Sequence, residues 1–139
     1  MEEKENFTMG KLMDFCDGIQ HIGIPAEDLG ATCQFYEELG FETVHRAEFG
    51  EGPQHVAFLK FGNLVLECYE EAPTAKTAGA VNHFAINCTD IDGAYALAKE
   101  KGYTIVSNEI EALPFWEKGI RFFIIEGPNK ERVEIDQIL

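Results

Sequence analysis

Two histidines and two glutamates could do chemistry together, because each kind recurs at the same place in two similar stretches of chain. His21 lies in the stretch IQHIGI and His83 in the similar stretch VNHFAI. Glu67 and Glu134 each come late in the segment that follows. Two imidazoles and two carboxylates suit a divalent ion such as zinc, nickel, cobalt, manganese or iron. A position left open on such an ion accepts water or substrate oxygens.

The similarity continues along the chain at a constant offset of 62 residues, as between positions 21 and 83. The same offset relates Asp28 to Asp90 and Gly40 to Gly102, together with three apolar pairs, Leu29 and Ile91, Phe41 and Tyr103, and Val44 and Val106. A fixed period indicates a repeated structural unit. We therefore expect one domain over 18–139 made of two repeats, 18–79 and 80–139, after an N-terminal extension, 1–17.

Each repeat is predicted to be a β-α-β-β-β unit. A short strand carrying the histidine precedes a helix that Asp28 or Asp90 caps and that ends near Gly40 or Gly102. The later strands are expected at 41–49, 54–61 and 64–69, and again at 103–110, 120–125 and 132–135. The predicted fold class is α+β, with two βαβββ modules forming a curved mixed sheet around a cleft.

Strand alternation predicts that the four side chains share one kind of face. If Ile22 and Ile24 face the helix, His21 points to the opposite face. The same alternation puts His83, Glu67 and Glu134 on the helix-free faces of their strands. If the two open faces turn toward each other, the four side chains converge in a cleft. The longer spacing in the second repeat is absorbed by a loop over 111–119.

Simpler explanations exist for each residue taken alone. A histidine on a strand is more often a surface or satisfied core residue than a ligand, and we assign His45 and His55 to that class. Glu67 and Glu134 both have acidic neighbours and could be solvated edge charges. Their recurrence in register favours a metal site. Candidate substrate contacts are Phe115, Trp116 and Phe123, with core packing as the alternative for the Phe122–Phe123 pair.

Composition limits the partners of the protein. The 139 residues include 25 acidic and 11 basic side chains, for a net charge of −14 and a pI near 4.5. Such a surface repels phosphate backbones and anionic lipid, so neither nucleic acid nor a membrane is expected as a partner. The sequence has no predicted export signal, and its four cysteines are widely spaced. We therefore expect reduced thiols and a cytoplasmic location.

Several motifs resemble the vicinal oxygen chelate superfamily, which includes glyoxalase I, bleomycin-resistance proteins and extradiol dioxygenases. They are the two histidine-bearing openings, the passage FYEELGF over 35–41 and the closing stretch over 122–135. The resemblance covers about residues 18–139. The order His, Glu, His, Glu is similar to that of glyoxalase I, which implies His21, Glu67, His83 and Glu134 as ligands of one divalent ion. Zinc or nickel is the first expectation, with cobalt, manganese or iron also open.

The resemblance implies a metal-dependent lyase, similar to lactoylglutathione lyase, acting on a small-molecule substrate. It would convert a 2-oxoaldehyde–thiol hemithioacetal of the methylglyoxal type to a 2-hydroxyacyl thioester by proton transfer, with Glu134 as the base and Glu67 as the other candidate. Pro25 stands where glutathione-dependent enzymes carry an arginine, so the thiol is open. The alternatives are a CoA-thioester epimerase, a dioxygenase or a non-catalytic resistance protein. A homodimer is implied, with the site within one chain or shared between two.

Overall fold

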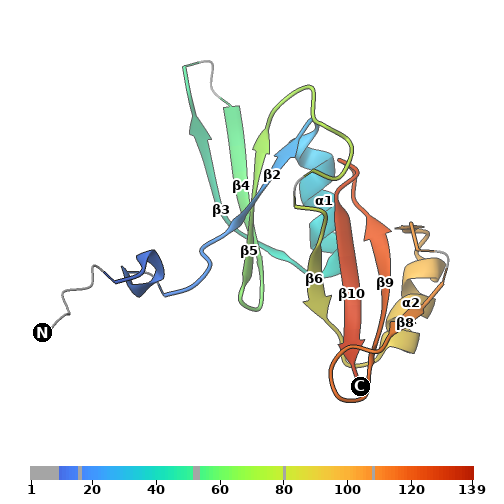
Figure 1. Cartoon of the computed structure of the whole chain (residues 1–139). Coiled ribbons are helices and arrows are strands. Elements are labelled where there is room, and N and C mark those ends of the chain that lie inside the picture. The colour runs from blue at the N-terminus through green and yellow to red at the C-terminus, as the bar shows by residue number, and fades with distance from the viewer. Residues whose placement is uncertain (1–9, 16, 52–53, 80, 108) are drawn as a thin grey trace, which may run out of the picture.

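The protein, described here by a computed structural model for residues 10–15, 17–51, 54–79, 81–107 and 109–139, contains two mixed sheets, one from each half of the chain (Figure 1). The first sheet has the strand order β2-β5-β4-β3, and the second has the order β6-β10-β9-β7 with β8 paired to β9. The α+β class is confirmed. Each of the two predicted modules forms its own mixed sheet and carries its own helix.

The elements of the first half are β2 (Ile22–Ala26), α1 (Leu29–Leu39), β3 (Glu42–Phe49), β4 (Gln54–Phe61) and β5 (Leu64–Glu70). Those of the second half are β6 (Phe84–Asn87), α2 (Ile91–Glu100), β7 (Thr104–Ile105), β8 (Glu111–Leu113), β9 (Ile120–Glu126) and β10 (Arg132–Ile138). A short 3-10 helix, η1 (Leu12–Phe15), precedes them. None of the helices in the described ranges is long and apolar enough to cross a membrane.

Both helices begin at the predicted caps. The Asp28 side chain accepts a hydrogen bond from the Ala31 N–H at 3.0 Å, and Asp90 accepts one from the Gly93 N–H at 3.1 Å. A cap of this kind satisfies a backbone donor that the first helical turn leaves free. Helix α1 ends at Gly40, whose φ of 117° is a conformation that side chains with a Cβ avoid. These cap predictions are confirmed.

Strand pairing brings the two ends of each half together. Strand β2 runs parallel to β5 with Gly23 opposite Glu67, and β6 runs parallel to β10 with Ala85 opposite Glu134. In each half the first strand therefore lies at the sheet edge beside the strand that carries the glutamate. The two similar stretches of sequence therefore pair their first and last strands in the same register.

The second half departs from the prediction in one strand. The expected strand over 103–110 is reduced to β7, two residues long. The Ser107 hydroxyl accepts the Ile124 N–H at 2.9 Å, so a side chain occupies a donor that a continued strand would have paired. Part of the expected loop, β8, pairs with β9 instead.

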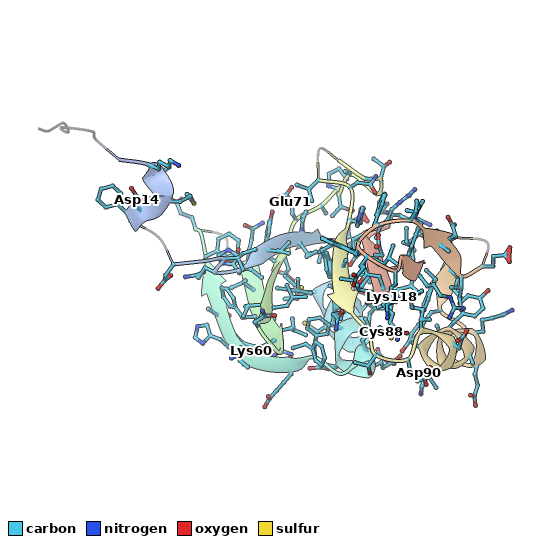
Figure 2. The ribbon with its side chains drawn as sticks, turned by 60° about the horizontal axis from the view of Figure 1, so that its bottom comes forward. Asp14, Lys60, Glu71, Cys88, Asp90 and Lys118 are labelled. Atoms are coloured by element: carbon cyan, nitrogen blue, oxygen red, sulfur yellow. The ribbon has the colours of Figure 1, made fainter. Side chains whose placement is uncertain are left out.

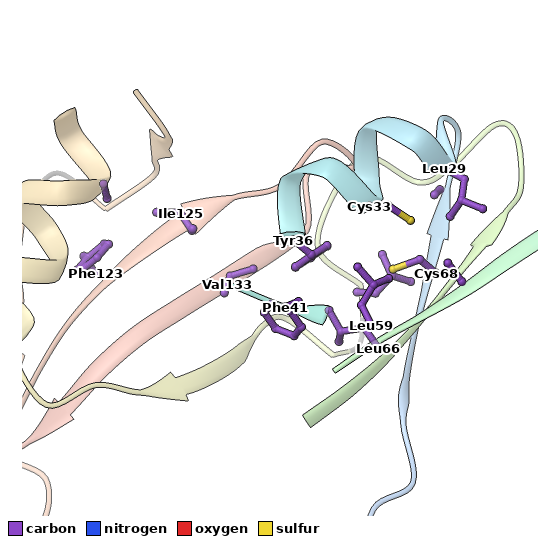
Figure 3. Close-up of a cluster of buried hydrophobic side chains, with 14 of the residues drawn as sticks. Leu29, Cys33, Tyr36, Phe41, Leu59, Leu66, Cys68, Phe123, Ile125 and Val133 are labelled. Atoms are coloured by element: carbon purple, nitrogen blue, oxygen red, sulfur yellow. The ribbon is translucent and has the colours of Figure 1, made fainter. Parts of the chain in front are cut away.

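The cores of the two halves are continuous through helix α1 (Figure 3). Tyr36 on α1 is fully buried, and its hydroxyl donates to a Glu131 carboxylate oxygen at 2.9 Å. The Asn129 side-chain amide donates to the Thr32 hydroxyl at 2.9 Å. These contacts tie α1 of the first half to the turn between β9 and β10 of the second. Cys33 is buried in the same core, as expected.

Candidate metal centre

The first candidate ligand pair forms at the edge of the first sheet. His21 directly precedes β2, and its Nε2 lies 3.3 Å from Glu67 Oε1 on β5. The two side chains are 34% and 31% exposed, so they are accessible from solvent. The alternation of β5, which buries Leu66 and Cys68 on the helix side, is what turns Glu67 to the open face.

The second pair is the equivalent of the first. His83 directly precedes β6, and its Nε2 lies 3.1 Å from Glu134 Oε1 on β10. Glu134 is the more buried carboxylate, with its side chain 14% exposed. A contact between a histidine and the glutamate of the same half is therefore present in both halves.

The second ring nitrogen of each histidine also has a matching partner. Nδ1 of His21 contacts the amide oxygen of Gln20, and Nδ1 of His83 lies 2.9 Å from the amide oxygen of Asn82. An amide oxygen only accepts hydrogen bonds, so each contact is a hydrogen bond in the tautomer that carries its proton on Nδ1. In that tautomer each Nε2 presents its lone pair to a carboxylate. Partners of this kind fix the tautomer of metal-binding histidines in proteins.

Each pair of facing acceptors holds together when a proton or a metal ion lies between them. A proton shared between Nε2 and the carboxyl group makes the contact a hydrogen bond, and a divalent ion in the same place would make the two groups a ligand pair. Neighbouring ligands on bonds of about 2.1 Å stand about 3.0–3.4 Å apart at tetrahedral or octahedral angles. The observed nitrogen–oxygen separations of 3.3 and 3.1 Å fall in this range. The residues present therefore fit half of a metal site in each half of the chain.

Phe58 on β4, which was not among the predicted site residues, completes the surroundings of the first pair. Its ring lies edge-on to the His21 ring, with centroids 5.9 Å apart, and also contacts the His45 ring at 5.8 Å. The signal was available in the strand register, because Phe58 stands opposite Glu67. His45, assigned above to the surface or core class, lies on the site face, whereas His55 lies at the surface, 3.8 Å from Glu48.

The electrostatics of the second pair are set by burial and by Asp136. Burial is the first cause that raises the pKa of Glu134 from its usual 4.5 to about 7, and a hydrogen bond and charge repulsion from Asp136 add to it. The two carboxyl groups are two residues apart on β10 and so share one face. A carboxyl group with a pKa near neutrality can both accept and return a proton at physiological pH.

The two pairs do not form one cluster within this chain. Among the described residues, no group of three or more His, Cys, Asp or Glu side chains is placed to hold a metal ion together. A cavity of about 380 Å³ lies between β2 and β6, with His83 in its wall. The other three candidate ligands do not line it. Of the two arrangements left open above, a site around all four side chains within one chain is not formed among the described residues, and a site shared between two chains stays a prediction.

The candidate substrate contacts lie in two different environments. Phe115 and Trp116 are exposed on the loop between β8 and β9, and Trp116 helps line a pocket of about 290 Å³. Phe123 is only 1% exposed and packs against Tyr95 of α2. Strand alternation places it on the helix side of β9, which leaves it no surface for substrate. It is a core residue, the alternative given for it above.

Comparison with known proteins identifies the architecture. The family model described as "Glyoxalase/Bleomycin resistance protein/Dioxygenase superfamily" matches residues 18–135. The chain is 34% identical over 127 residues to the uncharacterized protein YwbC of Bacillus subtilis, covering 86% of this chain and 96% of that protein.

Two solved structures illustrate the fold. A glyoxalase family protein from Enterococcus faecalis has a TM-score of 0.71 at 25% identity, covering 88% of this chain and 98% of that one. The fosfomycin resistance protein FosX from Listeria monocytogenes has a TM-score of 0.68 at 16% identity, covering 88% and 94%. At this low identity, the second similarity concerns the fold alone.

Proposed function

Because the chain belongs to the glyoxalase/bleomycin resistance protein/dioxygenase superfamily, we propose that it is a metal-dependent lyase of the glyoxalase I type. The substrate class would be a hemithioacetal formed from a 2-oxoaldehyde and a thiol, and the product a 2-hydroxyacyl thioester. The observation that carries the proposal is the pair of equivalent His–Glu contacts, each with an amide oxygen behind the ring. A chain of this fold that only bound a ligand would have no need to place both acceptor pairs in the same register.

His21, Glu67, His83 and Glu134 would hold one divalent ion, with zinc or nickel as the first expectation. When bound, such an ion supplies Lewis acidity that favours negative charge on the substrate's neighbouring oxygens. Glu134 takes the proton from the carbon next to the carbonyl and returns it to the adjacent carbon. In the metal-free protein burial is the first cause that raises the pKa of Glu134 to about 7, so the site disfavours a bare carboxylate and favours a carboxyl group that can hold a proton.

We propose further that two copies of the chain share each metal site. The support is that each half of the chain holds half of the ligand set, while the described residues of one chain hold no group of three. In a dimer with twofold symmetry, the first half of one copy faces the second half of the other, which gives two equivalent sites. Within each copy the proposal keeps one domain of two repeats over 18–139, acting in the cytoplasm.

The first test combines metal analysis with an assay. Protein purified without added chelator is analysed for metal, and turnover of methylglyoxal is measured with several low-molecular-weight thiols. Glu134→Gln should keep the fold but lower turnover by about three orders of magnitude, since the base is lost. Glu126→Gln is the matched control, because Glu126 is an acidic residue on the neighbouring strand whose partner is Lys130. Metal-free protein without turnover, or full activity in Glu134→Gln, would contradict the proposal.

The second test asks whether the site is shared. One chain carries His21→Ala with Glu67→Gln, the other carries His83→Ala with Glu134→Gln, and each is inactive alone. After unfolding and refolding together, a shared site regains about one quarter of wild-type activity, because half of the dimers are mixed and each has one intact site. If each site lies within one chain, the mixture stays inactive.

A further inference from the structure

The N-terminal arm, defined as residues 10–15 and 17–19, is an exposed apolar segment that the proposed activity does not use. It extends away from both sheets in the two views (Figure 1, Figure 2). Three of its large side chains are mostly exposed, Met13 at 66%, Phe15 at 82% and Ile19 at 72%. Its 3-10 helix contains no buried residue. Several large apolar groups this close together and this exposed are typical of an interaction segment.

A second apolar surface lies at the far end of the second sheet. We define the β10-end patch as Leu113, Phe115, Trp116, Ile138 and Leu139, all of them exposed. Its floor is a row across three strands, because Leu113 stands opposite Ile120, and Ile120 stands opposite Ile138. Leu113, Trp116, Ile120 and Leu139 help to line the pocket of about 290 Å³.

Ile138 of the patch shares a strand face with Glu134, one of the candidate metal ligands. Glu134 and Ile138 are four residues apart on β10, so their side chains point to the same side, about 13 Å apart along the strand. Trp116 at its rim has a φ of 66°, a conformation rare for a bulky residue and one that neighbouring structure must impose. The patch therefore lies at the end of the strand that carries Glu134.

Charge limits what can cover this surface. The protein carries a net charge of −14, which opposes the approach of a second copy over most of its surface. The patch itself has no charged side chain, and the adjacent Glu117 and Lys118 balance each other. The arm is close to neutral as well, with Lys11 against Asp14 and Asp17. The arm and the patch are thus apolar surfaces on which two acidic copies can meet.

The length of the arm matches the distance it would have to cover. Phe15 stands six residues before His21, a span of at most about 20 Å. If His21 of one copy and Glu134 of the other hold the same ion, the patch of that other copy begins about 13 Å away. In Figure 1 the arm lies on the opposite side of its own chain from β8 and the C-terminus. The patch of the partner is therefore the one within reach.

We infer that the N-terminal arm of each copy docks on the β10-end patch of a second copy, beside the shared metal site. This inference rests on the proposed two-chain site. In a twofold dimer each arm binds the patch of the other copy, so both arms are covered and no further copy is needed. The docked arm stabilises the dimer and shields one side of the site from water.

A photo-crosslinking amino acid at position 15 tests the contact directly. Irradiation should give a product of two-chain mass, with the new bond mapping to 113–116 or 138–139 of the other copy. Bonds only within one chain, or only to other regions of the second copy, would overturn the inference.

Dissociation of the dimer, followed by analytical ultracentrifugation, gives the second readout. Met13→Ser with Phe15→Ser should raise the dissociation constant about 100-fold, because two anchors lose their apolar contacts. Trp116→Ala should act in the same direction. Leu97→Ser is the matched control, since Leu97 is equally an exposed apolar residue, but on α2, outside arm and patch. An unchanged constant in the arm and patch variants refutes the docking.

The two proposals can fail separately. If mixed chains regain activity while crosslinks map elsewhere, the shared site stands and the arm inference is wrong. If the mixed chains stay inactive and the wild type is monomeric, both are wrong. Neither readout of the arm depends on turnover, so loss of activity alone decides nothing about it.

Discussion

The contact between Tyr36 and Glu131 holds the two halves of the chain together, and removing one oxygen atom tests this. In Tyr36→Phe the ring keeps its packing, so no cavity forms, but the hydrogen bond of 2.9 Å is lost. A hydrogen bond to a charged group contributes about 1.5–3 kcal/mol. Glu131 also accepts the Asn129 N–H at 2.7 Å, so its carboxylate keeps a partner. We therefore expect the lower end of that range, about 1.5–2 kcal/mol.

Tyr103→Phe is the matched control, because it also removes a tyrosine hydroxyl oxygen but is not expected to lower the free energy of unfolding. The Tyr103 hydroxyl is buried and has no hydrogen-bond partner among the described residues. Deleting it relieves a desolvation cost, so the free energy of unfolding should stay unchanged or rise by up to about 1 kcal/mol.

The assay is urea unfolding followed by circular dichroism, at one protein concentration for all variants, with the midpoint and slope fitted separately. The melting temperature of Tyr36→Phe should fall by roughly 5 °C. Equal effects of the two substitutions, or no loss in Tyr36→Phe, would show that the hydroxyl of Tyr36 does not join the two halves.

Three further outcomes are expected. Metal affinity, measured by calorimetric titration, should fall about tenfold per pH unit below pH 7, because binding must displace the proton that Glu134 holds there. Asp136→Asn should lower the pH at which this fall in affinity begins, because Asp136 helps to raise the pKa of Glu134. In the metal-free protein the raised pKa of Glu134 means that the folded state keeps a proton which the unfolded state loses above pH 4.5. The free energy of unfolding in urea should therefore decline as the pH rises from 4.5 toward 7. Asp28→Ala should cost about 1 kcal/mol in the same unfolding assay, since the Ala31 N–H loses its cap.

Local patterns in the sequence predicted most of the fold because each has a local physical cause. The caps at Asp28 and Asp90 depend on a side chain reaching its own helix, and the buried stripe of α1 depends only on helical spacing. Alternation along β5 and β10 was enough to put Glu67 and Glu134 on the open faces. The constant offset then linked the two halves.

The incorrect predictions come from structural features that interrupt the regular alternation of side chains along a strand. A register irregularity between Thr43 and His45 moves His45 to the face of Phe58, which strict alternation does not allow. Ser107 ends β7 early by a side-chain hydrogen bond that no periodicity shows. The placement of one sheet against the other depends on packing through Tyr36 and on any second copy. Alternation assigns a face but not the direction in which that face looks, so it could not decide whether the cleft forms within one chain or between two.

The number of metal ions per chain tests the central claim most directly. Equilibrium dialysis of the wild type against zinc or nickel, with metal and protein both quantified, should give one ion per chain. His21→Ala and His83→Ala should each abolish high-affinity binding, because both halves of the ligand set hold the same ion. Two ions per chain, or one variant that keeps full binding while the other loses it, would contradict a site built from both pairs.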